Sequence, residues 1–174
     1  MTSFADRMMR AAKLDVHLYE EVEADNTSMR QAMTVVLLSS VAAGIGFIGD
    51  GGLIGLLIGT VGALLGWYIW AFVTYLIGTK LLPEPQTSAD HGQLLRTIGF
   101  SSAPGMIRIF GFIPGMGILV NLLAGLWMFI AMVIAVRQAL DYRSPYRAVG
   151  VCAIGWIAQA LILALLVKMI TGMP

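Results

Sequence analysis

The chain has 174 residues, of which 58% are hydrophobic and only 12% are charged. An average soluble domain is about 25% charged, and a soluble fold of this length would leave too much of this apolar surface in water. The formal net charge of +1, without a basic stripe, gives no reason to expect a nucleic-acid partner. The composition therefore predicts an integral membrane protein.

Residues 1–30 form a polar, amphipathic segment. Its apolar residues recur at helical spacing and predict a helix over residues 3–24, with Ser3 as its cap. The charged residues of this segment are candidates for contact with a partner or with lipid: Arg7, Arg10, Lys13, Glu20, Glu21, Glu23 and Asp25. Three roles stay open for the helix, namely docking on the bundle, contact with lipid at the membrane surface, and binding of a partner. The segment does not have the order of a signal peptide, in which an apolar core follows a short basic stretch.

Four runs without charge follow, and each is long enough to cross a bilayer's hydrocarbon core, which needs about 20 apolar residues. They predict spanning helices over residues 31–47, most of 53–79, 116–136 and 148–167. The longest run covers the 29 residues between Asp50 and Lys80 and ends in aromatic residues that suit a membrane interface. As a helix it would span about 43 Å, which exceeds a hydrocarbon core of about 30 Å. We therefore expect it to tilt, to protrude at its aromatic end, or to lose its first residues to a turn at residues 49–52.

Residues 94–112 form an ambiguous element, because Pro104 and Arg108 interrupt an apolar sequence that ends just before Pro114. A proline kinks a helix. Arg108 follows Arg96 by 12 residues, which is about 18 Å along a helix, so its side chain could reach the far interface. A kinked spanning helix is the preferred interpretation, and a re-entrant hairpin is the alternative. The kinked helix gives five spanning helices in total.

The basic residues orient these helices. With the N-terminus in the cytoplasm, nine Lys and Arg residues lie inside and two, Arg108 and Lys168, lie outside. A re-entrant hairpin would change this count to eight and three. Because short cytoplasmic loops carry the excess of basic residues, we expect a cytoplasmic N-terminus and a C-terminus on the outer side. The predicted fold class is an all-α, polytopic membrane helix bundle of about five transmembrane helices, with a cytoplasmic amphipathic segment over residues 1–30 and the bundle over residues 31–174.

Glycines recur at steps of three or four residues in the second spanning helix, which places them on one helix face. In lipid, such a face lets two helix backbones approach closely. We interpret it as a packing surface, either within the chain or between copies of it. The glycines are Gly51, Gly55, Gly59, Gly62 and Gly66.

A few polar residues interrupt the other apolar runs. The neutral side chains of Asn121 and Gln159 predict hydrogen bonds between helices. Arg108 has no obvious acidic partner except Asp50, so a pair between these two residues is a hypothesis. The candidate functional polar or kink positions are Arg96, Pro104, Arg108, Pro114, Asn121 and Gln159.

The sequence contains no recognisable catalytic constellation. Cys152 is the only cysteine, and His17 and His91 stand far apart in polar segments, so we expect no metal site. There is no phosphate-binding loop and no hydrolase or metalloprotease motif. We expect the protein not to be an enzyme and to hold no cofactor.

Six segments in order carry a family resemblance. They are YEEVEAD at residues 19–25, QAMTVVLL at 31–38, AAGIG at 42–46, WAFVTYLIG at 70–78, RTIGFSSAPG at 96–105 and WMFIAMVIAVRQALD at 127–141. Together they resemble a bacterial member of the Yip1-domain family of polytopic membrane proteins. The resemblance covers nearly the whole chain, most specifically residues 96–141. It implies a five-helix bundle with a cytoplasmic N-terminus, in agreement with the distribution of basic residues.

The resemblance implies less about function. Eukaryotic relatives in the family act in vesicle trafficking and bind small Rab-type GTPases through their cytoplasmic N-terminal regions. Here that region covers only residues 1–30 and contains no eukaryotic-type trafficking motif. For a bacterial member the resemblance therefore implies a fold and a place in the inner (plasma) membrane, and no known reaction.

Two functions stay open. The preferred one is a membrane-organising or partner-recruiting scaffold, whose partners are the lipid bilayer, other copies of the chain and a cytoplasmic protein. The alternative is a conduit, carrier or lipid translocator that uses the broken helix between Pro104 and Pro114, since interrupted helices line transporter sites.

Overall fold

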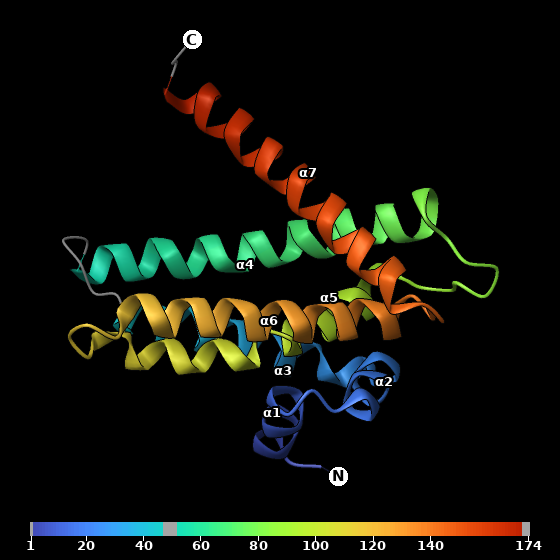
Figure 1. The fold of residues 1–174 in the computed structure, drawn as a ribbon, viewed down its shortest axis with the longest axis horizontal. Coiled ribbons are helices and arrows are strands. Elements are labelled where there is room, and N and C mark those ends of the chain that lie inside the picture. Colours follow the sequence, from blue (N-terminus) through green and yellow to red (C-terminus); the bar gives the residue numbers. More distant parts are fainter. Residues whose placement is uncertain (1, 47–51, 172–174) are drawn as a thin grey trace.

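The computed structural model describes residues 2–46 and 52–171, which form helices joined by short turns (Figure 1). The α-helices are α1 (Phe4–Ala12), α2 (Val16–Ala24), α3 (Met29–Gly46), α4 (Gly52–Leu76), α5 (His91–Phe100), α6 (Gly117–Ala139) and α7 (Pro145–Thr171). The remaining elements are the 3₁₀ helices η1 (Asn26–Ser28) and η3 (Ala103–Phe112) and the π-helix η2 (Ile77–Leu81). The predicted all-α bundle is confirmed.

Within the described residues, four helical stretches have the length and apolar composition of membrane spans: Asn26–Gly46, Gly52–Leu81, Gly117–Ala139 and Pro145–Ile162. A helix satisfies its backbone hydrogen bonds internally, so it can place apolar side chains against lipid without leaving polar groups unpaired. The four stretches coincide with the four charge-free runs of the sequence. The chain is therefore a polytopic membrane protein, as predicted.

The N-terminal segment is two helices, where the apolar spacing predicts one. The backbone turns at Leu14, whose φ of 62° lies in the left-handed region. Asp15 then caps α2, because its carboxylate accepts a hydrogen bond of 3.0 Å from the backbone N–H of His17. The predicted cap at Ser3 is confirmed by a 3.1 Å hydrogen bond from the backbone N–H of Asp6. The helical period runs through the turn, so periodicity alone gives no sign of this break.

Residues 94–112, which are ambiguous in the sequence, form most of α5 and all of η3. Near the beginning of α3, Ala32 lies against Gly99 of α5. At the end of α3, Gly46 lies against the backbone carbonyl of Arg108 in η3. The contacts thus advance in the same direction along α3 and along residues 94–112. This order is expected when residues 94–112 cross the bundle beside α3. In a re-entrant hairpin the order of contacts would reverse.

The crossing segment is not a kinked α-helix, because it changes helix type at Pro104. Proline has no N–H to donate, so the α-helical hydrogen-bond pattern stops there. The neighbouring Gly105 lies so close to Ser39 of α3 and Met128 of α6 that a Cβ at this position would overlap both side chains. The ten residues of η3 then extend about 20 Å, since a 3₁₀ helix rises about 2.0 Å per residue.

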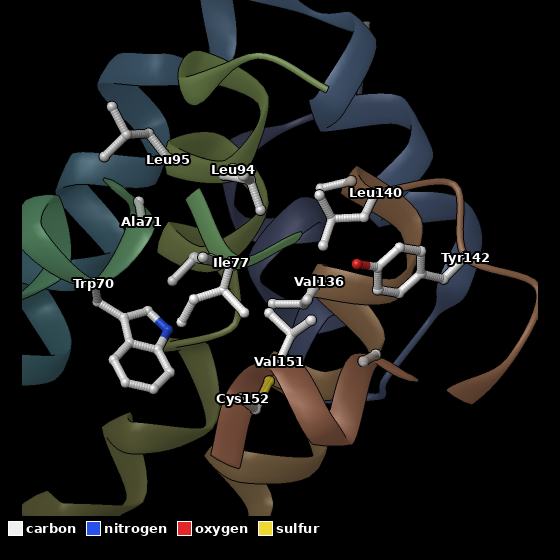
Figure 2. Close-up of a cluster of buried hydrophobic side chains, with 13 residues drawn as sticks. Trp70, Ala71, Ile77, Leu94, Leu95, Val136, Leu140, Tyr142, Val151 and Cys152 are labelled. Atoms are coloured by element: carbon white, nitrogen blue, oxygen red, sulfur yellow. The ribbon is translucent and has the colours of Figure 1, made fainter. Parts of the chain in front are cut away.

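One end of the molecule is compact. Buried side chains from α4, η2, α5, α6 and α7 form a cluster there, with Leu94 facing Leu140 (Figure 2). The hydroxyl of Tyr142 donates a hydrogen bond of 2.7 Å to the carbonyl of Leu82, which ties the loop after α6 to the loop after α4. Tyr142 follows Asp141, whose φ of 53° turns the chain sharply after α6. This end is packed in the manner of a soluble domain core.

The opposite half of the bundle exposes apolar side chains. Leu53 and Ile58 on α4 are 71% and 68% exposed, and Ile118 on α6 is 79% exposed. A bilayer would cover such surfaces. The long charge-free run thus divides into a first part with mostly exposed apolar side chains and a last part, from Trp70 onward, one face of which is buried in the compact end. This division accounts for a run longer than a hydrocarbon core.

Helix α7 crosses α4 obliquely and diverges from the bundle toward its C-terminal end (Figure 1). At the crossing, Gly155 lies against the ring of Trp70, and Gln159 lies against Gly66. The small residues at both contacts allow the two helices to approach closely. The surface of α4 on the lipid-facing side of Gly66 is left uncovered by the described part of the chain.

Replacing Gly99 by valine should destabilise the bundle by about 1–3 kcal/mol, the usual cost of overpacking. A Cβ at this position would come within 2.8 Å of the Cβ of Ala32 and 3.1 Å of its carbonyl oxygen. The matched control is Gly125→Val on α6, where a Cβ would meet nothing within 4 Å. Thermal unfolding in detergent, followed by circular dichroism, compares the two variants. Equal midpoints would contradict the close contact between α3 and α5.

Candidate functional site

A pocket of about 720 Å³ lies in the middle of the bundle. It is lined by residues from α3, α4, α5, η3, α6 and α7, so it touches every element with membrane-spanning character. Helix α4 contributes Gly62, Ala63 and Gly66, whose small size leaves the space open, and α6 contributes Met128 and Met132 on the other side. The pocket therefore separates α4 from α6.

Polar atoms in this pocket lack partners. The Nε of Arg108 and the Oε1 of Gln159 are buried, and neither has a hydrogen-bond partner in the described part of the chain. Ser39 and Ser102 add hydroxyl groups to the lining. Unpaired polar atoms are costly inside a membrane bundle, and an intramembrane ionisable group is a mark of function. These atoms make the pocket the strongest candidate for a functional site.

Aromatic rings form much of the apolar wall. Trp67 is fixed by a 3.0 Å hydrogen bond from its Nε1 to the carbonyl of Leu95. Trp156 on α7 lies with its ring centroid 6.0 Å from that of Phe129 on α6. The Nε1 of Trp70 is buried without a partner. A guanidinium and a few polar atoms set in aromatic and aliphatic surface are the typical composition of a site for a small or amphiphilic ligand.

The N-terminal helices dock on the bundle, α2 against α5 and α6 and α1 against η3 and the middle of α6. Arg96 of α5 donates from Nε to the carbonyl of Val22 at 3.0 Å and from Nη2 to the carbonyl of Glu23. Trp127 of α6 donates from Nε1 to the carbonyl of Ala12 at 2.8 Å. Of the three roles that the sequence leaves open for this segment, docking is the one these contacts support. Arg96 is a link between α5 and α2 and does not line the pocket.

Ion pairs tie α1 to α2. The side chain of Arg7 is only 10% exposed and lies 2.9 Å from carboxylates of both Glu21 and Asp25. Arg10 lies 2.6 Å from Glu21. Hydrogen bonds from Thr2 and from the two arginines lower the pKa of Glu21 to about 2. Four of the charged residues predicted to contact a partner or lipid thus form ion pairs within the hairpin instead: Arg7, Arg10, Glu21 and Asp25.

The outer face of the N-terminal hairpin remains open. Lys13 and Glu20 are exposed, and the side chain of Met9 is 59% exposed. Glu20 also accepts a hydrogen bond of 2.8 Å from Gln138 at the end of α6. Contact of this face with lipid or with a partner stays a prediction.

A second, smaller cavity of about 410 Å³ lies between α2 and the end of α6. Glu23 lines it and accepts a hydrogen bond of 3.1 Å from Gln93. Burial raises the pKa of Glu23 to about 7, nearby Asp141 adds to the shift, and Arg96 opposes it. Glu23 therefore gains or loses its charge near neutral pH, next to the link that holds α2.

The Yip1 domain matches residues 17–167 of the chain, from α2 into α7. The chain belongs to the Yip1-domain family. The resemblance stated from the sequence is confirmed, and α1 lies before the matched region. No curated protein and no solved structure matches the chain. The Yip1 domain contains the whole lining of the central pocket, so the pocket is a feature of the domain itself.

The glycine face on α4 of this Yip1 domain does not pack as the within-chain interpretation predicts. Gly66 lies against Gln159, but at the three glycines beyond it a Cβ would meet no neighbouring side chain or helix within 4 Å; they are Gly55, Gly59 and Gly62. These three glycines thus make no close contact with another described helix, since α7 has diverged before it reaches them (Figure 1), and their packing within the chain stays a prediction. Packing between copies stays a prediction, and Gly51 lies outside the described residues.

The structure places the predicted polar and kink residues in different surroundings. Arg108 lines the central pocket, and its backbone carbonyl lies against Gly46 at the end of α3; its reach to the far interface stays a prediction. Its hypothetical partner Asp50 lies outside the described residues.

Asn121 is exposed near the start of α6 and makes no side-chain hydrogen bond within residues 2–46 and 52–171, so the structure does not give it the predicted bond between helices. Gln159 contacts α4 through Gly66 without a hydrogen bond to its Oε1. Pro114 lies in the exposed turn between η3 and α6.

His91 is a candidate functional residue that the sequence did not indicate. Its ring centroid lies 5.0 Å from that of Tyr68, 5.7 Å from that of Phe72 and 6.4 Å from that of Tyr75. Its Nε2 is buried and has no hydrogen-bond partner within residues 2–46 and 52–171. The three aromatic residues have the spacing of one helix face, which could have indicated a common neighbour. In the part of the chain that the structure describes, no group of three or more His, Cys, Asp or Glu side chains could hold a metal ion.

Replacing Arg7 by glutamine should loosen α1 from α2, because Glu21 and Asp25 would lose a shared cation. A lysine-specific protease cutting at exposed Lys13 reports this opening. We expect cleavage roughly tenfold faster, which corresponds to about 1.4 kcal/mol, a moderate value for a partly buried pair. Arg30→Gln, which removes an exposed arginine at the start of α3, is the control. Equal cleavage rates would show that the pair does not hold the hairpin.

The raised pKa of Glu23 predicts a pH dependence. The folded-state pKa of about 7 exceeds the ordinary value of 4.5, so the stabilising contribution is complete below pH 4.5 and is lost as the pH rises through 7. The wild-type chain should therefore lose thermal stability between pH 5 and pH 8 relative to Glu23→Gln, which does not titrate. Parallel stability curves for the two proteins would contradict this assignment.

Proposed function

We propose that this Yip1-domain protein is a membrane-organising scaffold that associates with itself through the exposed glycine face of α4. One observation carries the proposal: Gly55, Gly59 and Gly62 lie on one side of a membrane-spanning helix and have nothing packed against them in the described chain. At about 100° per residue, these three positions fall within one narrow sector of the helix.

Lipid alone does not account for such a face. Glycine in a helix interior costs about 0.8–1.0 kcal/mol relative to alanine, and a lipid-facing position accepts any apolar side chain. Small residues at helical spacing are instead the usual means by which two membrane helices bring their backbones together. Ile58, which flanks the face and is 68% exposed, would pack along the side of a partner helix.

A second copy of the chain is the occupant that fits best. A two-fold interface places the same surface on both partners, and this surface consists of glycines with the apolar Ile58 beside them. The C-terminal half of the chain's own α7 is the competing occupant, since it diverges from α4 just before the exposed glycines (Figure 1). Cross-linking between chains separates these two arrangements.

The proposed setting is a bacterial inner membrane, with the compact end in the cytoplasm. Most of the basic residues that the structure describes lie on α1, at the start of α3, in η2, on α5 and between the end of α6 and the start of α7, which supports this orientation. The exposed face around Met9 and Lys13 is then available to a cytoplasmic protein partner. We propose no catalytic role for the chain.

The conduit or carrier remains the second candidate. It is favoured by the central pocket, which the broken segment η3 lines with Arg108, since interrupted helices line transporter binding sites. A carrier would need this pocket to open alternately to the two sides of the membrane. The scaffold needs no such motion, which is why it is preferred.

The test is the double substitution Gly55→Leu and Gly59→Leu. In the wild-type chain, light scattering of the protein in detergent should give the mass of a dimer or larger assembly, and the double variant should be a monomer with unchanged helicity. Loss of close packing over two glycines should weaken association roughly tenfold or more, since 1.4 kcal/mol corresponds to tenfold.

Gly125→Leu on α6 is the matched control, because a Cβ there also meets nothing within 4 Å. It should leave the oligomer intact. A monomeric wild-type chain in both detergent and native membranes would sink the proposal. Cysteine cross-links from α4 to α7 of the same chain, with none between chains, would assign the glycine face to α7 instead.

A further inference from the structure

We propose that the central pocket binds one anionic phospholipid, with the lipid phosphate paired to Arg108 and the acyl chains lying along the opening between α4 and α6. This site adjoins the glycine face of the scaffold, with which it shares Gly62, and it does not require the chain to move lipid across the membrane.

The first argument is the uncompensated charge. Arg108 is the charged residue among those that line the pocket, and it forms no ion pair with another described residue. The chain has ten acidic residues, and all except Asp50 lie in the N-terminal hairpin or in loops at the compact end. A guanidinium at this depth favours a bound counter-charge. A phosphate suits it well, because the planar guanidinium can bind two phosphate oxygens together.

The second argument is the set of polar groups that line the same pocket as the guanidinium. Ser39 and Ser102 line the pocket and offer hydroxyl groups, and Trp70 offers a buried Nε1–H that has no partner among the described residues. These groups can donate to phosphate or ester oxygens. The Oε1 of Gln159 is a buried acceptor without a donor, and a headgroup that carries a hydroxyl would satisfy it. A glycerol headgroup meets both requirements.

The third argument is the shape and surface of the pocket. Its volume of about 720 Å³ lies within the range of about 300–1,000 Å³ that is typical of ligand sites. Met128 and Met132 provide flexible side chains that adapt to irregular acyl groups. Apolar side chains of α4 and α6 beside the pocket are exposed, and Leu65 and Leu126 are each 60% exposed. An acyl chain that leaves the pocket would therefore meet apolar surface.

The test uses the full-length chain reconstituted in bilayers of phosphatidylcholine. Three of the four tryptophans, Trp67, Trp70 and Trp156, line the pocket, so lipids brominated in their acyl chains report occupancy by quenching tryptophan fluorescence. Brominated phosphatidylglycerol is compared with brominated phosphatidylcholine at equal mole fraction. We expect the wild-type chain to prefer phosphatidylglycerol by about tenfold, as a charged hydrogen-bonded pair supplies.

Arg108→Gln should abolish this preference, and Arg108→Lys should retain part of it. Arg143→Gln removes the same charge from an exposed loop at the compact end and should leave the preference unchanged. Ala63→Phe, which fills the pocket from α4, should reduce quenching by both lipids and provides a second variant if Arg108→Gln does not fold.

Three results would overturn the proposal. The first is equal quenching of the wild-type chain by the two lipids. The second is loss of the preference on addition of inorganic phosphate, which would assign the site to a free anion. The third is a preference that appears only in Asp50→Asn, which would mean that Arg108 is paired within the chain.

Discussion

The fold depends on the close contact of one broken segment, α5 and η3, with α3. In lipid, helices are not driven together by water, so they associate through small residues that allow close packing and through buried polar contacts. Here Gly99 meets Ala32, and Gly46 meets the carbonyl of Arg108. Because the contact runs in one direction along α3, it carries the broken segment through the bundle and inserts η3 beside α6. The floor of the central pocket, the position of Arg108 and the link from α5 to α2 all follow from this insertion.

The compact end and the lipid-facing half of the bundle are packed in different ways. In the compact end, apolar side chains are buried around Leu94 and Leu140, and ion pairs and hydrogen bonds hold α1 and α2 in place. In the lipid-facing half, the helices expose apolar side chains and are held by fewer contacts. The transition occurs within α4, near Trp70, where α7 crosses it. The pocket lies at this transition, because the helices cease to be packed tightly there before they are fully surrounded by lipid.

The sequence predicts the class of fold well and the local breaks poorly, for a physical reason. Charge-free runs report the solvent directly, so the four long spans follow from composition. The break at Leu14 depends on the cap that Asp15 supplies, and the helical period runs straight through it. Pro104 predicts an interruption but not a change to a 3₁₀ helix, which depends on contacts with Ser39 and Met128. Glycine spacing identifies a helix face without identifying what covers it, and a single arginine in an apolar segment does not reveal whether it will face the interface or a pocket.

The glycine face and the pocket share residues, which couples the two proposals. Gly62 belongs to the exposed face and also lines the pocket, and Gly66 lines the pocket beneath Gln159. A helix from a second copy that packed over Gly55 and Gly59 would therefore pass close to the open side of the pocket. A lipid held there would either complete the interface or obstruct it. In either case the free energy of association would depend on lipid occupancy, and by linkage the affinity for lipid would depend on association to the same extent. A scaffold built in this way would respond to the anionic lipid content of its own membrane, with Arg108 as the sensing group and α4 as the element common to both equilibria.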